Sequence, residues 1–293
     1  MTTAIAKRAP ARADPAPPRP PNRLAEQITG RSYLSHSQLS MMRSCPRKFA
    51  FSYVEHAHKD FTPSSLLFGG SIHTALELYY RCWLEGLAVT HEALLSAYHD
   101  SWRRQNEQSG DDVPVRFNVG EDDDKLHALA DRMLKAFAAS PLATPKGIIL
   151  GIEEELRVVL DPTLPDVLAK VDLVTQTADG LHVVDFKTSK SRWNEHKAAE
   201  SGDQLVLYGV TVSRMSQSLG VPVKLHFAIL TKHKTPLVQI LPVPTDTNRV
   251  AAMKDGVAEV WAAIQSGNYY PSPSPMNCTG CPYRSRCPVF AGR

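Results

Sequence analysis

The sequence predicts an α/β fold in which a mixed sheet is flanked by helices. Helical patterns dominate the first half of the chain, five strand-like segments lie between residues 147 and 243, and a further helical pattern precedes a cysteine-rich end. The 293 residues are 43% hydrophobic, enough for a sizeable core, and no apolar run approaches the roughly 20 residues that cross a bilayer. We therefore expect one soluble, cytoplasmic domain over residues 31–293, with no membrane partner.

Residues 1–30 are predicted to form a disordered tail. They are rich in proline, alanine and arginine, and they lack the apolar stretch of a secretory signal. An organellar transit peptide is the weaker alternative, because the proline density opposes an amphipathic helix.

Ordered structure is expected to begin at residues 33–39, where a serine can cap a short helix that runs towards Ser44. Pro46 suits the first turn of a second helix. Cys45 therefore lies at a junction between two helices. A single cysteine in such a place is more commonly a small buried residue than a ligand.

Residues 67–77 are predicted to form a turn around Gly69 and Gly70 that leads into a helix, with His73 in its first turns. Taken alone, His73 is more commonly a core histidine than a metal ligand. Two more helices are expected over residues 92–105 and 125–138. The acidic loop between them lacks the ligand spacing of a calcium loop, so we expect it to be solvated.

The first strand is expected within residues 147–160, which are apolar except for three consecutive glutamates and an arginine. Side chains alternate along a strand, so Glu153 and Glu155 share one face and Glu154 lies on the other.

A hairpin is predicted from residues 167–177 and 181–188, with Asp179 and Gly180 as the turn. Its second strand ends on two charged side chains, Asp185 and Lys187, which lie on one face. Neither charge is expected at the end of an apolar strand without a partner.

The hairpin register places Asp172 near these charges. With a two-residue loop, Asp172 lies opposite Lys187, and with a four-residue loop it lies opposite Asp185. Two carboxylates and a lysine suit a divalent cation bound through oxygen, beside an ammonium that orients water or stabilises an anion. A cross-strand salt bridge explains the same residues equally well.

The polar segment 189–200 follows, with Lys190, Arg192 and Lys197 around Trp193. Such a loop could hold a nucleic-acid strand by phosphate contact and base stacking, or it could simply be solvated. The formal net charge of +3 permits nucleic-acid binding without arguing for it.

A helix is expected over residues 201–219, with Gln204 and Tyr208 on one side of it. This pair could contact a phosphate or order Lys187, or it could be a partly buried polar pair. Strands at residues 223–231 and 237–243 and a helix at residues 246–266 complete the predicted fold.

The chain ends on a Cys-x2-Cys-x5-Cys cluster formed by Cys278, Cys281 and Cys287. Three thiols so close together favour metal ligation over disulfides in a chain without a secretory signal. Zinc commonly uses paired knuckles, and the second half-knuckle is missing. A 4Fe-4S cluster needs four thiolates, and Cys45 is the obvious fourth.

These motifs together resemble the PD-(D/E)XK nuclease superfamily, and in particular its RecB-like branch with an iron-sulfur cluster. The resemblance covers about residues 33 to 290. The matching features are Gly69-x3-His73, an acidic residue on the first strand for which Glu153 is our choice, Asp172, Asp185-x-Lys187, Gln204-x3-Tyr208, and Cys45 with the C-terminal cysteines.

The resemblance implies a site and a cofactor. His73, Asp172, Asp185 and the Phe186 carbonyl would hold Mg²⁺ or Mn²⁺, and Lys187 would assist the attacking water. Cys45, Cys278, Cys281 and Cys287 would hold a 4Fe-4S cluster that joins the first and last parts of the domain. Closing that loop of 233 residues costs about 5 kcal/mol in a logarithmic chain-entropy model.

The resemblance also implies a DNA exonuclease that prefers single-stranded ends, in repair or recombination, phage DNA processing or CRISPR adaptation. A helicase or a CRISPR-adaptation protein is the expected partner, because the chain has no Gly-x4-Gly-Lys-Ser/Thr loop of its own. The alternative is a non-catalytic DNA-binding or scaffold subunit of a helicase-nuclease complex.

Overall fold

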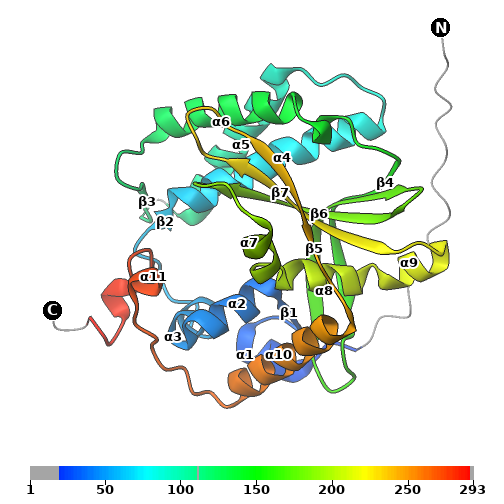
Figure 1. Cartoon of the computed structure of the whole chain (residues 1–293). Coiled ribbons are helices and arrows are strands. Elements are labelled where there is room, and N and C mark those ends of the chain that lie inside the picture. Colours follow the sequence, from blue (N-terminus) through cyan, green and yellow to red (C-terminus); the bar gives the residue numbers. More distant parts are fainter. Residues whose placement is uncertain (1–19, 111, 291–293) are drawn as a thin grey trace, which may run out of the picture.

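A computed structural model describes residues 20–110 and 112–290. Its centre is a six-stranded mixed sheet with helices on both faces (Figure 1). The helices α4 (Ser64–Leu84), α5 (His91–Ser109) and α6 (Asp123–Ala138) pack on one face around one hydrophobic core. A second core on the other face is formed with α2 (His36–Ser44), α8 (Asp203–Thr211) and α10 (Thr247–Gln265). The predicted α/β class with a mixed sheet is confirmed.

The sheet has the strand order β1-β5-β6-β7-β8, and β4 also pairs with β5. Two pairs, β1 with β5 and β6 with β7, are parallel, and the other pairs are antiparallel. The strands are β1 (Tyr33–Ser35), β4 (Ile148–Val158), β5 (Asp166–Thr177), β6 (Gly180–Ser189), β7 (Val223–Thr231) and β8 (Val238–Val243). The five predicted strands therefore correspond to β4 through β8, and the short β1 of this sheet was not predicted.

Smaller elements connect these layers. They are α1 (Arg23–Thr29), α3 (Pro46–Phe49) and the π-helical turn Ala50–Val54, the paired strands β2 (Thr62–Pro63) and β3 (Val115–Arg116), the 3-10 turns Pro141–Ala143 and Arg284–Arg286, and the helices α7 (Glu195–Glu200), α9 (Ser213–Leu219) and α11 (Pro275–Cys278). Ser35 caps α2 in a capping box with Gln38, and Pro46 begins α3. Both helices therefore begin where the sequence predicted.

The N-terminal prediction needs a correction where the structure describes the chain. Residues 1–19 lie outside the described residues, but the predicted tail also includes α1, which is an ordered helix. Asn22 caps its N-terminus, Gly30 ends it in a left-handed conformation, and Ala25 and Thr29 are buried. These caps and this burial stabilise a helix that proline-rich composition concealed.

The predicted turn at Gly69 and Gly70 is also wrong, because α4 continues through both glycines. Each glycine weakens a helix by about 1 kcal/mol relative to alanine. The apolar face of α4 offsets this cost, since it buries Leu67, Phe68 and Ile72. His73 therefore lies in the middle of a long helix rather than in its first turns.

Two further boundaries differ from the sequence prediction. The polar segment at residues 189–200 ends in α7, which Asn194 caps. The helix predicted over residues 201–219 is divided into α8 and α9 at Val212. The hydroxyls of Thr211 and Ser213 bond to backbone carbonyls one turn earlier, which competes with regular helix hydrogen bonding.

The hairpin of β5 and β6 settles the open question of register. Thr177 pairs with Gly180, and Leu173 pairs with Val184. The next position in this register sets Asp172 opposite Asp185, which is one of the two predicted alternatives. The loop has two residues, Ala178 and Asp179, and so lies one position earlier than the predicted loop of Asp179 and Gly180, which would have set Asp172 opposite Lys187.

No helix in the described part of the chain is both long enough and apolar enough to cross a membrane.

Candidate metal centre and cysteine pocket

The sheet opens into a fork at the end of the hairpin. The pairing of β5 with β6 stops at Leu173 and Val184, after which β6 pairs only with β7. The other end of β5 pairs with β1. Inside the fork, Oδ2 of Asp172 accepts a hydrogen bond of 2.6 Å from the backbone N–H of Phe186. This bond fixes the Asp172 carboxylate where the strand ladder is interrupted.

Three potential metal ligands meet at this fork from three elements. Nδ1 of His73 on α4 lies 3.5 Å from Oε1 of Glu153 on β4 and 3.5 Å from Oδ1 of Asp172 on β5. One ligand atom from each residue lies within 4.8 Å of the others. Their spacing in the sequence does not predict this contact, because the three residues lie on three different elements that are far apart along the chain.

Glu153 takes an unusual backbone conformation to reach the site. Its φ is +51°, and the register between β4 and β5 shifts just before it, between Ile149 and Gly151. A positive φ at a residue other than glycine costs on the order of 1–3 kcal/mol and is commonly found at functional sites. Of the three adjacent glutamates, the structure thus places Glu153 at the fork, while Glu155 is exposed.

Lys170 is a site residue that the sequence analysis missed. Its Nζ lies 2.7 Å from Oε2 of Glu153, the oxygen that does not face His73. Lys170 precedes Asp172 by two residues, so strand alternation could have indicated that both side chains point the same way. The contact holds the Glu153 carboxylate in place from the outer side.

Asp185 and Lys187 form the second part of the site. Asp185 is 1% exposed, and Nζ of Lys187 lies 2.7 Å from its Oδ2. The same Nζ donates a hydrogen bond of 2.8 Å to Oε1 of Gln204, whose Nε2 donates to the hydroxyl of Tyr208. The predicted pair on α8 therefore orders Lys187 through Gln204.

Burial and charge shift the pKa values at the fork. Burial raises the pKa of Asp185 to about 6, with Lys187 acting against the shift and Asp172 adding to it. Burial alone would lower the pKa of His73, but hydrogen bonds and attraction from Asp172 and Glu153 raise it to about 10. The negative potential that holds a proton on His73 is the same potential that attracts a divalent cation.

The residues at the fork fit Mg²⁺ or Mn²⁺. They offer carboxylate oxygens and one imidazole nitrogen, which are ligands that these ions accept. Oδ2 of Asp185 is buried and, apart from its ion contact with Lys187, receives no well-aligned hydrogen bond from the described residues. A buried carboxylate oxygen in this state has capacity for a ligand. The Phe186 carbonyl lies in the same stretch of β6, and its role as a ligand stays a prediction.

Trp193 makes several contacts within the protein. Its indole packs against Phe227 with ring centroids 5.2 Å apart, and its Nε1 donates to Ser189. Nζ of Lys197 lies 4.7 Å from the centroid of the same ring. The aromatic ring thus anchors the segment between β6 and α7 and leaves Lys190 and Arg192 exposed.

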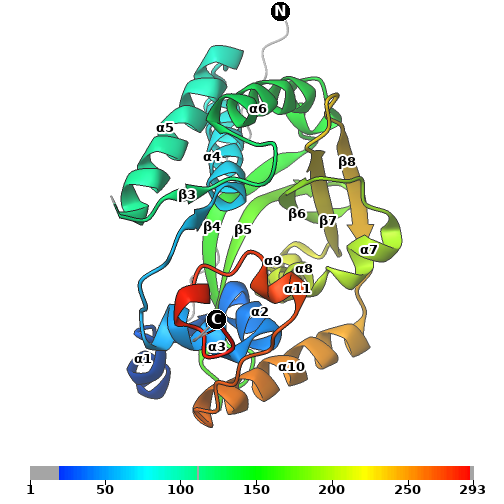
Figure 2. The same cartoon turned by 90° about the vertical axis from the view of Figure 1, so that its left-hand side faces the viewer.

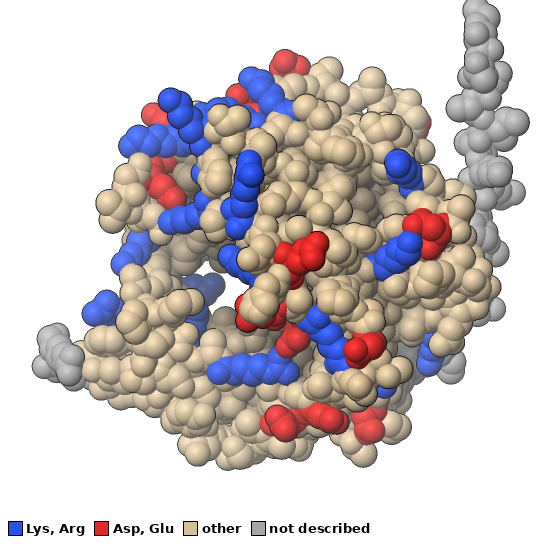
Figure 3. Space-filling model, viewed as in Figure 1, with Lys and Arg blue, Asp and Glu red and all other residues tan. Residues whose placement is uncertain are grey.

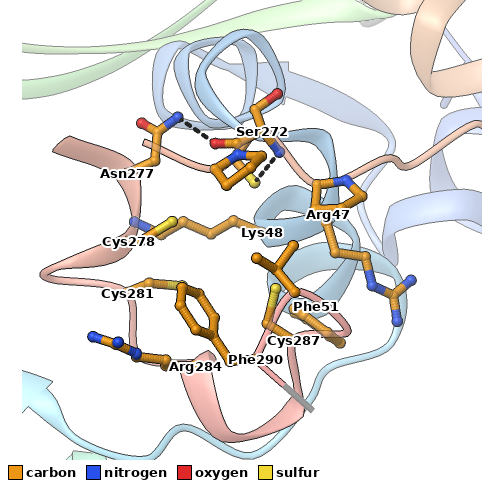
Figure 4. A pocket seen from close by; sticks show the side chains of 14 residues that line it. Arg47, Lys48, Phe51, Ser272, Asn277, Cys278, Cys281, Arg284, Cys287 and Phe290 are labelled. Atoms are coloured by element: carbon orange, nitrogen blue, oxygen red, sulfur yellow. Dashed lines mark hydrogen bonds between the residues drawn. The ribbon is translucent and has the colours of Figure 1, made fainter. Parts of the chain in front are cut away.

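All four predicted cluster cysteines line one pocket, shown in Figure 4. Cys45 reaches it from the junction of α2 and α3, and Cys278, Cys281 and Cys287 reach it from the C-terminal segment. The backbone N–H of Ser272 donates to the sulfur of Cys45 over 3.5 Å. Cys82, in contrast, lies on α4 and does not line this pocket.

The α2–α3 segment and the C-terminal segment, which carry these cysteines, are also joined by other contacts. They lie side by side in Figures 1 and 2. Asn277 donates to the carbonyl of Ser44 over 2.7 Å, and the backbone N–H of Asp60 donates to the carbonyl of Pro282 over the same distance. Tyr283 is buried and packs against Phe51. The pocket is therefore preformed, with no disulfide among its cysteines, and its donor set fits an iron-sulfur cluster.

The position of Glu153 leads to a direct prediction. Glu153→Gln is expected to lower the rate of metal-dependent DNA cleavage at least about tenfold, because it removes a negative charge from the fork. Glu155→Gln, two residues away on the exposed side of β4, is the matched control and is expected to cleave at the wild-type rate. Equal losses in the two variants, measured on labelled oligonucleotides, would contradict this assignment.

The chain is similar to one protein-family model and, more distantly, to solved structures. Residues 33–288 match the family model of the PD-(D/E)XK nuclease superfamily. The crystal structure of a candidate exonuclease from Eubacterium rectale superposes with a TM-score of 0.52 at 15% identity, covering 88% of this chain and 89% of that one. The structure of SSO0001 reaches a TM-score of 0.31 at 12% identity, covering 87% and 96%. A search of curated proteins finds no significant match.

Proposed function

The chain belongs to the PD-(D/E)XK nuclease superfamily, and from that premise we propose that it is a Mg²⁺- or Mn²⁺-dependent deoxyribonuclease that degrades single-stranded DNA from an end. The observation that carries the proposal is the fork of the sheet, where Asp172, Asp185, Glu153 and His73 converge beside Lys187. An array of carboxylates with one lysine suits phosphodiester hydrolysis.

Each residue at the fork has a role in this proposal. Asp172, Asp185 and His73 hold the cation together with Glu153, which Lys170 keeps in position. When bound, a divalent cation supplies Lewis-acid stabilisation of the charge that develops on the phosphate.

Lys187 is held ready for the reaction. It is fixed between Asp185 and Gln204, and its ammonium can orient the attacking water or stabilise the negative charge of the transition state. Tyr208 in turn fixes Gln204, and burial raises the pKa of the Tyr208 hydroxyl, so it remains a neutral hydrogen-bonding group.

A hollow on the surface, bordered by basic side chains, supports the proposal of a nucleic-acid substrate. In Figure 3 a hollow lies between the upper helices and the cysteine-rich end, and Lys and Arg side chains gather on its upper and left rim. Contacts of this kind attract phosphates without reading bases. Exposed Lys190 and Arg192 can add such contacts close to β6, which favours a substrate that is tolerant of sequence.

We further propose that the cysteine pocket holds a 4Fe-4S cluster ligated by Cys45, Cys278, Cys281 and Cys287. Lys48 and Arg284 also line this pocket. Burial raises the pKa of the Cys281 thiol, and the positive charge of Lys48 acts against this shift. A cluster in this position would join the junction of α2 and α3 to the C-terminal segment. Because the sequence contains no phosphate-binding loop of a helicase, we propose that any unwinding or CRISPR-adaptation step depends on a separate protein.

The end requirement is tested with linear and circular single-stranded DNA of the same sequence. The linear form is expected to be degraded with Mg²⁺ or Mn²⁺ and to survive with EDTA, blunt duplex is expected to be cut weakly, and the circle is expected to persist. Cutting of the circle at the rate of the linear form would show an endonuclease. Failure to cut either form would favour the non-catalytic DNA-binding or scaffold subunit instead.

A further inference from the structure

Lys232 stands out among the basic residues because it is partly buried and unpaired. It follows the last residue of β7, and its backbone N–H donates a 2.7 Å hydrogen bond to the carbonyl of Ser189 at the end of β6. Its Nζ lies 4.3 Å from the ring centroid of Phe68 on α4. No carboxylate of the described residues forms an ion pair with it.

The electrostatic surroundings of Lys232 also favour an anion. Burial lowers its pKa, the Glu121 carboxylate acts against this shift, and Lys190 adds to it. Glu121 is already bound to Ser64 and Asn118 by hydrogen bonds. Two lysines and one carboxylate that already has hydrogen-bond partners therefore act on this position, and a phosphate would balance the remaining positive charge.

Gly69 is the second observation, and it lies next to Phe68. A Cβ added at Gly69 would meet only Oγ1 of Thr188, at an ordinary distance of 3.8 Å, and the backbone there is regular helix. Neither the backbone nor a neighbouring side chain thus requires glycine at this position. A glycine that costs helix stability without such a reason indicates the close approach of something outside the protein.

The neighbouring Gly70 provides the contrast. A Cβ there would lie 2.6 Å from Oε1 of Gln105. That side chain cannot move away easily, because its Nε2 donates to the Ser71 hydroxyl and the Ser101 hydroxyl. Packing inside the protein therefore explains Gly70, whereas Gly69 faces partly exposed space between α4 and β6.

These features lie close together along α4 and the end of β6. His73 is at the metal site, and Gly69 is one helical turn earlier on the same side of α4. Gly69 lies beside Thr188, and the carbonyl of the next residue, Ser189, accepts the hydrogen bond from Lys232. We propose that the nucleic-acid strand bound at the metal site continues along α4 across Gly69, and that Lys232 holds one of its phosphates. This inference deepens the proposed function and depends on its nucleic-acid substrate, but not on cleavage.

The test measures binding without cleavage. The affinity of the full chain for a short fluorescent oligothymidylate is measured by anisotropy in EDTA over a range of salt concentrations. One phosphate contact to a single strand contributes about 0.7 to the slope of log K against log salt. Lys232→Met is expected to reduce the slope by about that amount and to bind more weakly at every salt concentration.

Matched variants make the result specific. Lys234→Met, an exposed lysine two residues further along the same loop, is expected to keep the wild-type slope, and Lys232→Arg is expected to restore it. An unchanged slope in Lys232→Met, an equal loss in Lys234→Met, or no binding by the wild-type chain would each overturn the inference. If the wild-type chain binds but does not cleave with Mg²⁺ or Mn²⁺, the proposed nuclease activity is wrong. The salt slopes of the variants still show whether Lys232 contacts a phosphate.

Two alanine variants test whether the nucleic-acid strand passes over Gly69. Gly69→Ala is expected to melt at the wild-type temperature or above, and to bind the oligothymidylate several-fold more weakly, since its methyl group narrows the path of the strand. Gly70→Ala is expected to melt at a lower temperature because of the contact with Gln105. Wild-type binding by Gly69→Ala would show that the strand does not pass over this glycine.

Discussion

Asp185→Asn is expected to reduce DNA cleavage by about a thousandfold or more. The carboxylate is buried in the fork, and the side chain of Lys187 depends on it for an ion pair of 2.7 Å. The amide keeps the shape but loses the charge that binds a cation, and about 4 kcal/mol of lost transition-state stabilisation corresponds to this factor. The measurement is the cleavage rate of labelled single-stranded DNA with Mg²⁺ or Mn²⁺, alongside Mn²⁺ affinity by calorimetry.

Lys187→Met separates the two halves of this site. It is expected to retain Mn²⁺ binding and still lose cleavage by about a hundredfold or more, because its ammonium acts on water and phosphate and not on the cation. Asp255→Asn, on the exposed side of α10, serves as the surface control. Wild-type cleavage by Asp185→Asn or Lys187→Met would remove the fork from consideration as the catalytic site.

Cys281→Ser is expected to lose both colour and stability. Protein purified without oxygen should be brown with broad visible absorption, as a 4Fe-4S centre predicts, and the variant should be colourless. The cluster would close the long loop between Cys45 and the C-terminal cysteines and so restrict the unfolded chain. Its loss is expected to lower the free energy of unfolding by up to about 5 kcal/mol. Iron and sulfide content and thermal melting are measured on the same samples.

Cys82→Ser is the matched control for this experiment. Cys82 lies on α4 away from the pocket, so colour and melting temperature are expected to stay at wild-type values. If the wild-type protein is colourless and contains zinc, the cluster identity is wrong but the four ligands remain. If Cys281→Ser retains iron and stability, the pocket does not bind the metal.

The sequence predicted the strands well because strong local patterns define them. Alternation and a turn signal located β5 and β6, and the observed β7 coincides with the predicted segment. The register of the hairpin was left open, because the stretch of Ala178, Asp179 and Gly180 does not fix where the loop begins, and the observed loop is Ala178 and Asp179. The turn at Gly69 and Gly70 was predicted wrongly, since local glycine content says nothing about the apolar face that α4 buries.

By itself the sequence determined the set of residues that carry chemistry, because Asp172, Asp185, Lys187 and the clustered cysteines stand out in type and spacing from the apolar segments around them. Only the tertiary structure decided which of them meet. The fork between β5 and β6 brings His73 and Glu153 to Asp172, and the positive φ of Glu153 selects one glutamate from three. Lys170 and Lys232 were assigned to their proposed roles only because the structure shows their contacts with residues of other elements. The physical reason is that spacing fixes the direction of a side chain along its own element, whereas distances between elements depend on how the two hydrophobic cores pack against the sheet.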